Sequence, residues 1–268
     1  MLIDTQYNTK SKKLIVSYVD ESGTIKLKYF DWECPTKYVK CDDNDSERDT
    51  RYKSWDGFSV KMEEVNHPDR YAIYEFLDAL PEEEREEIFK FNLPQCYFID
   101  IETEILNTGD PLVDGFPEAA DKFDSQENLI KKGAYSSVLS ISIVYEDKII
   151  LMGLKDMPQD MQDRIKNNTN KYFENDNSNY QFKYIKYDCE FDMMYSFFHN
   201  MVPKMPLLTG WNFIKYDWVY LVNRARKISK VVNGRTITIY PNISSPTKRM
   251  NKVFMSDTEM PAHRMIFD

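Results

Sequence analysis

Apolar and polar residues alternate along several short stretches of the chain, a period-two pattern that is typical of β-strands. Residues 12–31 alternate on both sides of the turn sequence DESG, which predicts a β-hairpin. Residues 69–78 and the segment LPEEEREEIFKF predict two short helices, the second with Pro81 in its first turn and acidic residues near its N-terminus. The polar stretch 42–52 predicts a loop. Together these elements predict a small α+β domain over residues 1–94.

A second group of elements begins at residue 96. Its strand patterns are, in order, CYFIDIETEI, YSSVLSISIVYE, KIILMGL, QFKYIKY, PLLTGWN and NGRTITIYP. Helix patterns fall on residues 189–201 and on DWVYLVNRARKI, whereas the Asn-rich stretch NNTNKYFENDNSN predicts an exposed loop. Strands interspersed with helices predict a mixed α/β sheet with flanking helices over residues 95–268.

Composition narrows the class of protein. Hydrophobic residues make up 42% and charged residues 29% of 268 residues, as in ordinary globular proteins. Only 8 residues are glycine, which disfavours nucleotide-binding folds built on glycine loops. The 4 cysteines form no C-x-x-C pair, which favours free thiols in a reducing compartment. No signal peptide and no apolar run of membrane-spanning length is present, so a cytoplasmic protein without a membrane partner is expected.

Charge is distributed unevenly along the chain. The net charge is −9, yet between residues 201 and 254 basic residues abound and the only acidic residue is Asp217. Such a basic segment on an acidic protein predicts either a local contact with a polyanion or a solvated charged face.

Asp100 and Glu102 stand two residues apart inside the apolar run CYFIDIETEI. Period-two spacing places both carboxylates on one face of a strand, where they repel each other unless a positive charge is near. Among the five D-x-E sequences of the chain, only this one lies centrally in a long apolar strand. The alternative is a partly exposed strand whose acidic side faces water.

The stretch LLTGWNFIKYDWVYLVNRAR supplies a third acid. Gly210 follows an apolar strand and permits a close backbone approach, Asn212 follows the turn, and Asp217 begins an amphipathic helix. Taken alone, Asp217 could simply cap that helix. Taken with Asp100 and Glu102, it offers the oxygen ligands that Mg²⁺ or Mn²⁺ prefers, and a pair of such ions can promote phosphodiester hydrolysis.

The sequences FIDIE, DGFPE at 114–118 and TGWNFIKYDWVYLVNR at 209–224 resemble the N-terminal third of a family B DNA polymerase, most closely the T-even phage type. FIDIE resembles the first exonuclease motif and GWNFIKYD the second, in the same order. In the first 94 residues the resemblance is weaker and rests mainly on SYVDESG. The resemblance implies an RNase H-like 3′–5′ proofreading exonuclease, preceded by the polymerase N-terminal domain, and a host-cytoplasmic location if the protein is viral.

Functional roles follow from the same resemblance. It implies that two Mg²⁺ or Mn²⁺ ions are held by catalytic carboxylates, namely Asp100, Glu102 and Asp217. The implied contacts to single-stranded DNA at the primer 3′ end are Phe116, which would stack on bases, and Asn212. From the basic segment, Lys215 and Arg224 are further candidate DNA contacts. The loop between Glu102 and Phe116 is longer than the family pattern, which affects the placement of Phe116.

The third exonuclease motif of the family, Y-x-x-x-D, is absent. The acids downstream of Asp217 that could replace it are Asp257, Glu259 and Asp268, and none follows a Tyr by four residues. We therefore expect the metal site to be completed by a residue outside this chain. The palm, fingers and thumb are expected in a second polypeptide if the chain is a natural split subunit. The alternatives are an intein-interrupted half and an expression fragment.

Three functional hypotheses result. The first is a polymerase subunit that carries most of a proofreading exonuclease and needs the remaining polymerase polypeptide for activity. The second is a non-catalytic nucleic-acid-binding or scaffold subunit of a replication complex. The third is a free-standing RNase H-like nuclease, which would need a fourth acid such as Asp188 or Glu190.

Overall fold

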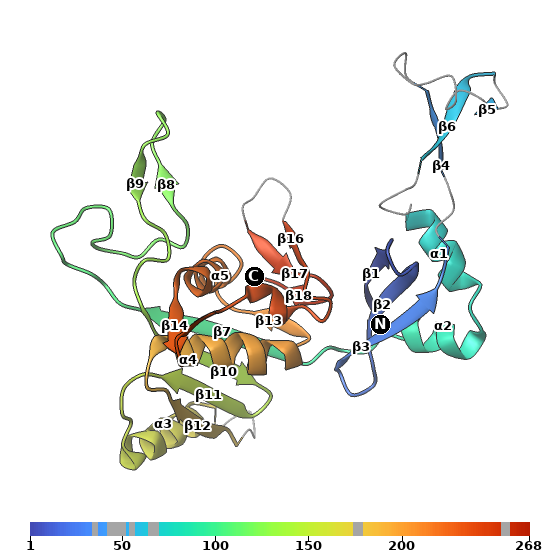
Figure 1. Cartoon of the computed structure of the whole chain (residues 1–268). Coiled ribbons are helices and arrows are strands. Elements are labelled where there is room, and N and C mark those ends of the chain that lie inside the picture. Colours follow the sequence, from blue (N-terminus) through green and yellow to red (C-terminus); the bar gives the residue numbers. More distant parts are fainter. Residues whose placement is uncertain (34–36, 42–51, 54–56, 64–69, 174–178, 253–257) are drawn as a thin grey trace. The chain divides into compact units, whose positions relative to one another are not determined.

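The computed structural model describes the chain except for residues 34–36, 42–51, 54–56, 64–69, 174–178 and 253–257. Contacts divide it into two compact units (Figure 1). The first comprises Met1–Asp20 and Lys26–Asn92, and the second comprises Glu21–Ile25 and Leu93–Asp268. Each unit has its own hydrophobic core.

The first unit combines small sheets with two helices. One sheet has the order β1-β2-β3 and the other the order β4-β6-β5, with the bounds β1 Leu2–Asn8, β2 Lys13–Val19, β3 Ile25–Asp31, β4 Lys37–Lys40, β5 Tyr52–Lys53 and β6 Ser59–Glu63. The helices are α1 (Arg70–Asp78) and α2 (Glu82–Phe89). Leu14 and Val16 of β2 pack with Leu77 and Ile88 of the helices. The expected hairpin and both expected helices are thus present, whereas the expected loop 42–52 lies outside the described residues except for Tyr52.

A six-stranded mixed sheet forms the centre of the second unit, in the order β12-β11-β10-β7-β13-β18 (Figure 1). Its strands are β7 Cys96–Thr103, β10 Val138–Tyr145, β11 Lys148–Gly153, β12 Gln181–Lys186, β13 Leu207–Thr209 and β18 Met265–Ile266. Strand β10 runs antiparallel to both of its neighbours, β7 and β11. The remaining pairs, β11 with β12, β7 with β13 and β13 with β18, are parallel. This arrangement confirms the expected mixed α/β architecture.

Helices flank this sheet, with the bounds α3 Gln159–Tyr172, α4 Glu190–Ser196 and α5 Asp217–Lys227. A π-helix, Phe197–Met201, continues α4, and 3₁₀ turns cover Val202–Lys204 and Pro241–Ser244. Apolar residues of the π-helix and of α5, including Phe197, Trp218 and Leu221, pack with Ile99 and Ile141 of the sheet. The Asn-rich stretch was wrongly expected to be loop throughout, because α3 extends through its first residues to Tyr172.

Three two-stranded hairpins complete the second unit: β8 (Lys122–Phe123) with β9 (Leu129–Lys131), β14 (Ser229–Val232) with β15 (Arg235–Thr238), and β16 (Met250–Lys252) with β17 (Glu259–Pro261). None of the helices that the structure describes combines the length and apolar composition needed to cross a membrane.

Candidate active site

Strand β7 presents its two acids on an open face. Side chains alternate along it, so that Ile99 and Ile101 are buried while Asp100 and Glu102 are exposed. The strand is nevertheless an inner one, because β10 and β13 pair with its two edges. Strand β7 is therefore an inner strand, as expected. It also has the acidic, water-facing side that was the alternative interpretation.

Gly210 brings the second motif against this strand. It follows β13, and a Cβ atom at its position would lie 2.3 Å from the backbone oxygen of Ile99. Any other residue would push β13 and β7 apart at this point. Asn212 follows in the left-handed backbone region with φ 55° and an exposed side chain. Its carbonyl accepts a hydrogen bond from the backbone N–H of Tyr216 at 2.9 Å, which closes the turn before α5.

Asp217 is the first residue of α5 and is only 5% exposed. Its Oδ1 accepts a hydrogen bond of 3.1 Å from the backbone N–H of Ile101, the residue between Asp100 and Glu102. Burial raises the pKa of Asp217 to about 6; the Ile101 bond opposes this shift, and the negative charges of Asp100 and then Glu102 reinforce it. The structure therefore brings the three predicted carboxylates into one electrostatically coupled site.

The chemistry of this donor set fits a divalent cation. Three carboxylates offer hard oxygen ligands, and their mutual repulsion is relieved by positive charge. Within the described parts of the chain, however, no three His, Cys, Asp or Glu side chains are already arranged as a metal-binding cluster. Asp100, Glu102 and Asp217 are thus the residues that could hold Mg²⁺ or Mn²⁺, with an incomplete ligand shell.

The described candidates for a further acid, Glu259 and Asp268, each have a partner within the chain. Glu259 forms an ion pair with Arg226. Asp268 accepts a hydrogen bond from the backbone N–H of Ile214 at 2.6 Å. Asp257 lies outside the described residues. Each described candidate downstream of Asp217 thus already has a partner within the chain.

Phe116 lies beside the second motif, although 100 residues separate the two in sequence. Its ring is 69% exposed, and its centroid is 5.6 Å from that of Tyr216, with the planes tilted by 38°. The preceding loop is ordered by Asp114, which accepts hydrogen bonds from Thr108 and Gly109. The longer loop thus still delivers Phe116 next to the residue that precedes Asp217.

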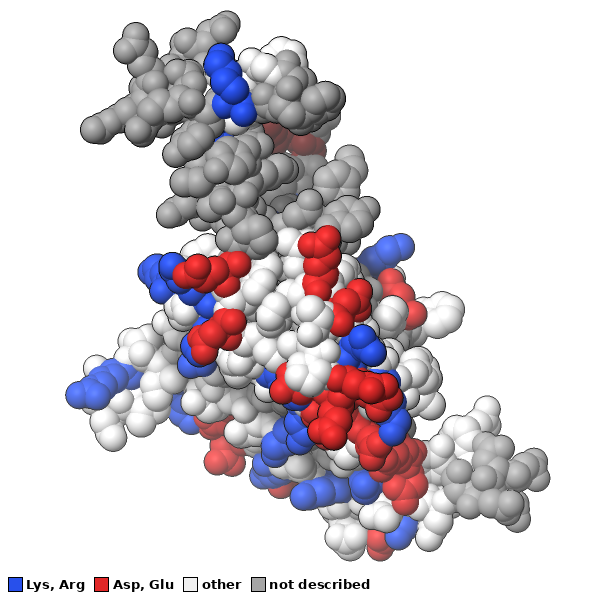
Figure 2. Space-filling model, turned by 90° about the vertical axis from the view of Figure 1, so that its right-hand side faces the viewer, with Lys and Arg blue, Asp and Glu red and all other residues white. Residues whose placement is uncertain are grey.

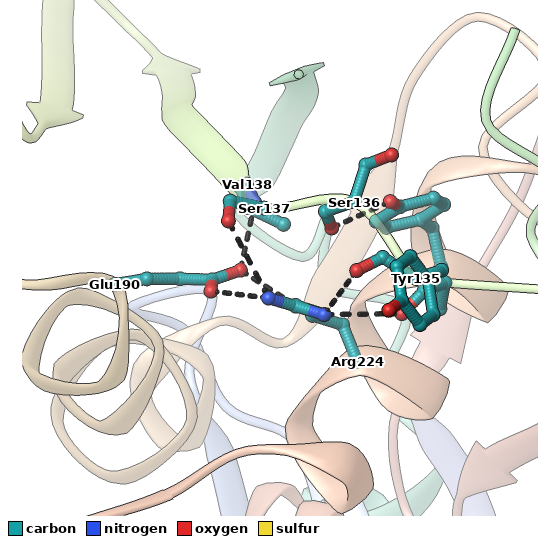
Figure 3. Close-up of polar contacts among 8 residues, drawn as sticks. Tyr135, Ser136, Ser137, Val138, Glu190 and Arg224 are labelled. Carbon is teal, nitrogen blue, oxygen red and sulfur yellow. Dashed lines mark hydrogen bonds and ion pairs between the residues drawn. The ribbon is translucent and has the colours of Figure 1, made fainter. Parts of the chain in front are cut away.

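Arg224, a predicted DNA contact, forms a largely buried ion pair with Glu190. Its Nε and Nη2 donate to the carboxylate of Glu190 at 2.8 and 2.7 Å, and its Nη1 donates to the backbone oxygen of Tyr135 at 2.5 Å (Figure 3). Glu190 also accepts from the N–H of Val138, and both charged side chains are about seven-eighths buried, at 14% and 13% exposure. The guanidinium and the carboxylate are thus occupied by each other rather than presented to solvent.

Lys215 is exposed, as a DNA contact would require. It lines an open groove of about 540 Å³ with Tyr216, Phe123 and Asn223. Several cations of the basic segment are instead paired with acids from other parts of the second unit: Arg224 with Glu190, Arg226 with Glu259, Lys227 with Asp121 and Lys230 with Asp192. Figure 2 presents the side of the chain that lies to the right in Figure 1, and on it a cluster of acidic side chains adjoins basic ones. These four cations of the described residues are therefore already partly neutralised within the chain.

Sequence reasoning missed two aromatic residues of this site. Tyr216 carries the ring that supports Phe116, and Trp211, beside Asn212, is 92% exposed. Tyr216 lies in the motif GWNFIKYD, but nothing in the local sequence indicates its contact with a segment so far away. Trp211 could have been noticed as a large aromatic residue in a polar turn.

A mixed sheet with carboxylates on an inner strand and at the start of the adjacent helix defines an α/β domain with a candidate phosphodiester-cleaving site. The family model for the exonuclease domain of DNA polymerase family B matches residues 128–268. The chain therefore belongs to the family B DNA polymerase exonuclease domain family. The match includes Asn212 and Asp217 but begins after Asp100, Glu102 and Phe116. A comparison with curated proteins finds no significant match.

Proposed function

We propose that this chain carries most of the 3′–5′ proofreading exonuclease of a family B DNA polymerase, with an RNase H-like fold. One observation carries the proposal. The buried carboxylate of Asp217 accepts a hydrogen bond from the backbone N–H of Ile101, the residue between the exposed acids Asp100 and Glu102. The sheet supports the fold assignment, because antiparallel strands β11, β10 and β7 continue into parallel strands β13 and β18.

The substrate would be the 3′ end of single-stranded DNA. Phe116 would stack on an unpaired base near the terminus, and Asn212 and Lys215 would contact the strand. Asp100, Glu102 and Asp217 would hold two Mg²⁺ or Mn²⁺ ions, which when bound supply a nucleophile and stabilise the leaving oxygen. The terminal phosphodiester would lie against the exposed face of β7 that carries Asp100 and Glu102.

The partner is the remaining polymerase polypeptide. Because the described residues present three carboxylates, we propose that the last metal ligand comes from the palm-bearing polypeptide or the segment joined to it. We further propose that residues 1–94 form the polymerase N-terminal domain and residues 95–268 the exonuclease domain. The closer likeness to the T-even phage type rests on the motifs FIDIE and GWNFIKYD.

A nuclease assay tests this function. A 5′-labelled oligo-dT would be incubated in Mn²⁺ with the chain alone, and with the chain plus the remaining polymerase polypeptide. We expect shortening from the 3′ end only in the mixture, and its loss when Asp100→Ala and Asp217→Ala are combined. Phe116→Ala, which leaves the acids intact, should raise KM more than it lowers kcat. Degradation that survives the double substitution would contradict the assignment.

A non-catalytic role is the second candidate. It is favoured by the observation that the described acids are not arranged as a complete metal-binding cluster. In that case the chain would bind single-stranded DNA or hold the replication complex together, and the mixture would not degrade oligo-dT. Binding of oligo-dT that is unchanged by Mn²⁺ and by the loss of both acids would support this alternative.

A further inference from the structure

The Phe116 loop is exposed and yet held in place. Beyond the ring contact between Phe116 and Tyr216, the Tyr216 hydroxyl donates to the backbone oxygen of Pro117 at 2.9 Å. One side chain thus supports both the aromatic ring and the backbone that follows it. An exposed ring that leans on a second ring has fewer accessible rotamers than a ring on a free loop.

Helix α5 provides the rigid base for this support. A polar stripe at helical spacing donates to backbone oxygens of the segment between Phe116 and β10. Its members are Tyr216 to Pro117, Tyr220 to Ser136 at 2.7 Å, Asn223 to Ala119 at 2.9 Å and Lys227 to Gly133. The helix that begins with Asp217 therefore also holds both ends of the segment that contains β8 and β9. Within this stripe, Tyr216 is the member whose ring meets Phe116.

We propose that Tyr216 is a positioning residue that couples the base-stacking ring of Phe116 to the carboxylate of Asp217. Its backbone immediately precedes Asp217, and its N–H closes the turn onto Asn212. Its side chain holds the Phe116 loop from behind, so a base stacked on the free face of Phe116 lies at a fixed distance from the acids. This inference rests on the proposed function, since it assumes that single-stranded DNA stacks on Phe116.

A double-mutant cycle on the full chain tests the coupling. Binding of fluorescein-labelled oligo-dT would be followed by anisotropy in EDTA, where no cleavage occurs. We expect Tyr216→Leu and Phe116→Ala each to weaken binding about fivefold to tenfold, and the double variant to be no weaker than Phe116→Ala alone. If Tyr216→Leu weakens binding by the same factor with and without Phe116, or does not weaken it at all, the coupling is overturned.

Tyr220→Phe is the matched control, because it removes the same kind of hydroxyl-to-carbonyl bond one turn along the same helix. It should leave oligo-dT affinity within twofold of wild type, whereas Tyr216→Phe should weaken it about threefold. Hydrogen exchange without DNA adds a readout independent of the proposed function. Tyr216→Leu should speed exchange about tenfold in residues 108–121 and leave α5 unchanged. If the wild-type chain does not bind oligo-dT, the proposed function fails. If Tyr216→Leu leaves hydrogen exchange in residues 108–121 unchanged, Tyr216 does not support the loop and the inference is overturned.

Discussion

The carboxylate of Asp217 accepts a hydrogen bond from the backbone N–H of Ile101, a residue 116 positions earlier in the chain. This bond attaches the start of α5 to the inner strand β7 between Asp100 and Glu102. A buried carboxylate beside two other acids is electrostatically unfavourable until a proton or a cation neutralises it. The same contact therefore locates the site and makes its stability depend on pH and on metal.

The first prediction concerns pH in the absence of metal. In the folded chain the pKa of Asp217 rises from 3.8 to about 6, so the folded state holds this proton more tightly than the unfolded state. The stabilisation is complete below pH 3.8 and is lost as pH rises through about 6. Asp217→Asn should therefore match wild type near pH 4 and be more stable by about 2–3 kcal/mol at pH 8. Urea unfolding in EDTA, followed by tryptophan fluorescence, measures the unfolding free energies of wild type and variant at each pH.

Asp188→Asn provides the control for this experiment, because Asp188 is exposed and begins no helix. Its stability relative to wild type should stay within about 0.5 kcal/mol across the same pH range. A difference between Asp217→Asn and wild type that does not grow with pH would contradict the buried, charge-coupled environment of Asp217.

Adding a divalent metal at neutral pH should offset the destabilisation caused by the buried, charged carboxylate of Asp217. A cation that binds only the folded chain stabilises it by about 2.7 kcal/mol at a hundredfold excess over its dissociation constant. We expect Mn²⁺ to raise the urea midpoint of wild type and to have little effect when Asp100→Asn and Glu102→Gln are combined. In EDTA that variant should be at least as stable as wild type, since repulsion on β7 is removed. Equal responses of wild type and variant to Mn²⁺ would argue against a metal site at these acids.

Gly210 gives a prediction about geometry. In Gly210→Ala the new Cβ would meet the Ile99 oxygen at 2.3 Å, so β13 must move away from β7. We expect a loss of about 2–3 kcal/mol in unfolding free energy and a loss of exonuclease activity in the assembled enzyme, because the turn that carries Asp217 shifts. Urea unfolding and the oligo-dT assay measure the two effects.

Gly109→Ala is a control for Gly210→Ala, because it introduces backbone strain without a steric overlap. Gly109 has φ +88° but no atom within 4 Å of a built Cβ. Its substitution should cost about 1 kcal/mol of unfolding free energy. If Gly210→Ala were no more costly than Gly109→Ala, the close approach between β13 and β7 would not be the reason for glycine at this position.

Local sequence patterns were sufficient for the elements that hold the acids. Alternation in CYFIDIETEI predicted which side of β7 carries Asp100 and Glu102, and helical spacing predicted the start of α5 at Asp217. What failed depended on contacts between distant segments. Charge suggested that Arg224 faces DNA, because its partner Glu190 lies 34 residues away and the pairing leaves no local signal. The support of Phe116 by Tyr216 was missed for the same reason.

The last prediction separates structural from DNA-facing cations. Arg224→Ala removes one partner of a buried ion pair and leaves the Glu190 carboxylate and the oxygens of Tyr135 and Ala134 without their donor. Such a loss typically costs about 3–5 kcal/mol. Lys215 is exposed, so Lys215→Ala should change stability by less than about 0.5 kcal/mol and weaken oligo-dT binding more steeply at low salt.

Arg226→Ala is the control for charge removal from the same helix, because Arg226 forms a half-exposed pair with Glu259. It should cost under about 1 kcal/mol. Urea unfolding and anisotropy titrations at two salt concentrations distinguish the three variants. Arg224→Ala should lower stability while any folded fraction keeps its affinity for oligo-dT. The opposite result would be an Arg224→Ala chain that is stable but binds oligo-dT weakly. It would show that the ion pair with Glu190 is not required for the fold and that Arg224 contacts DNA.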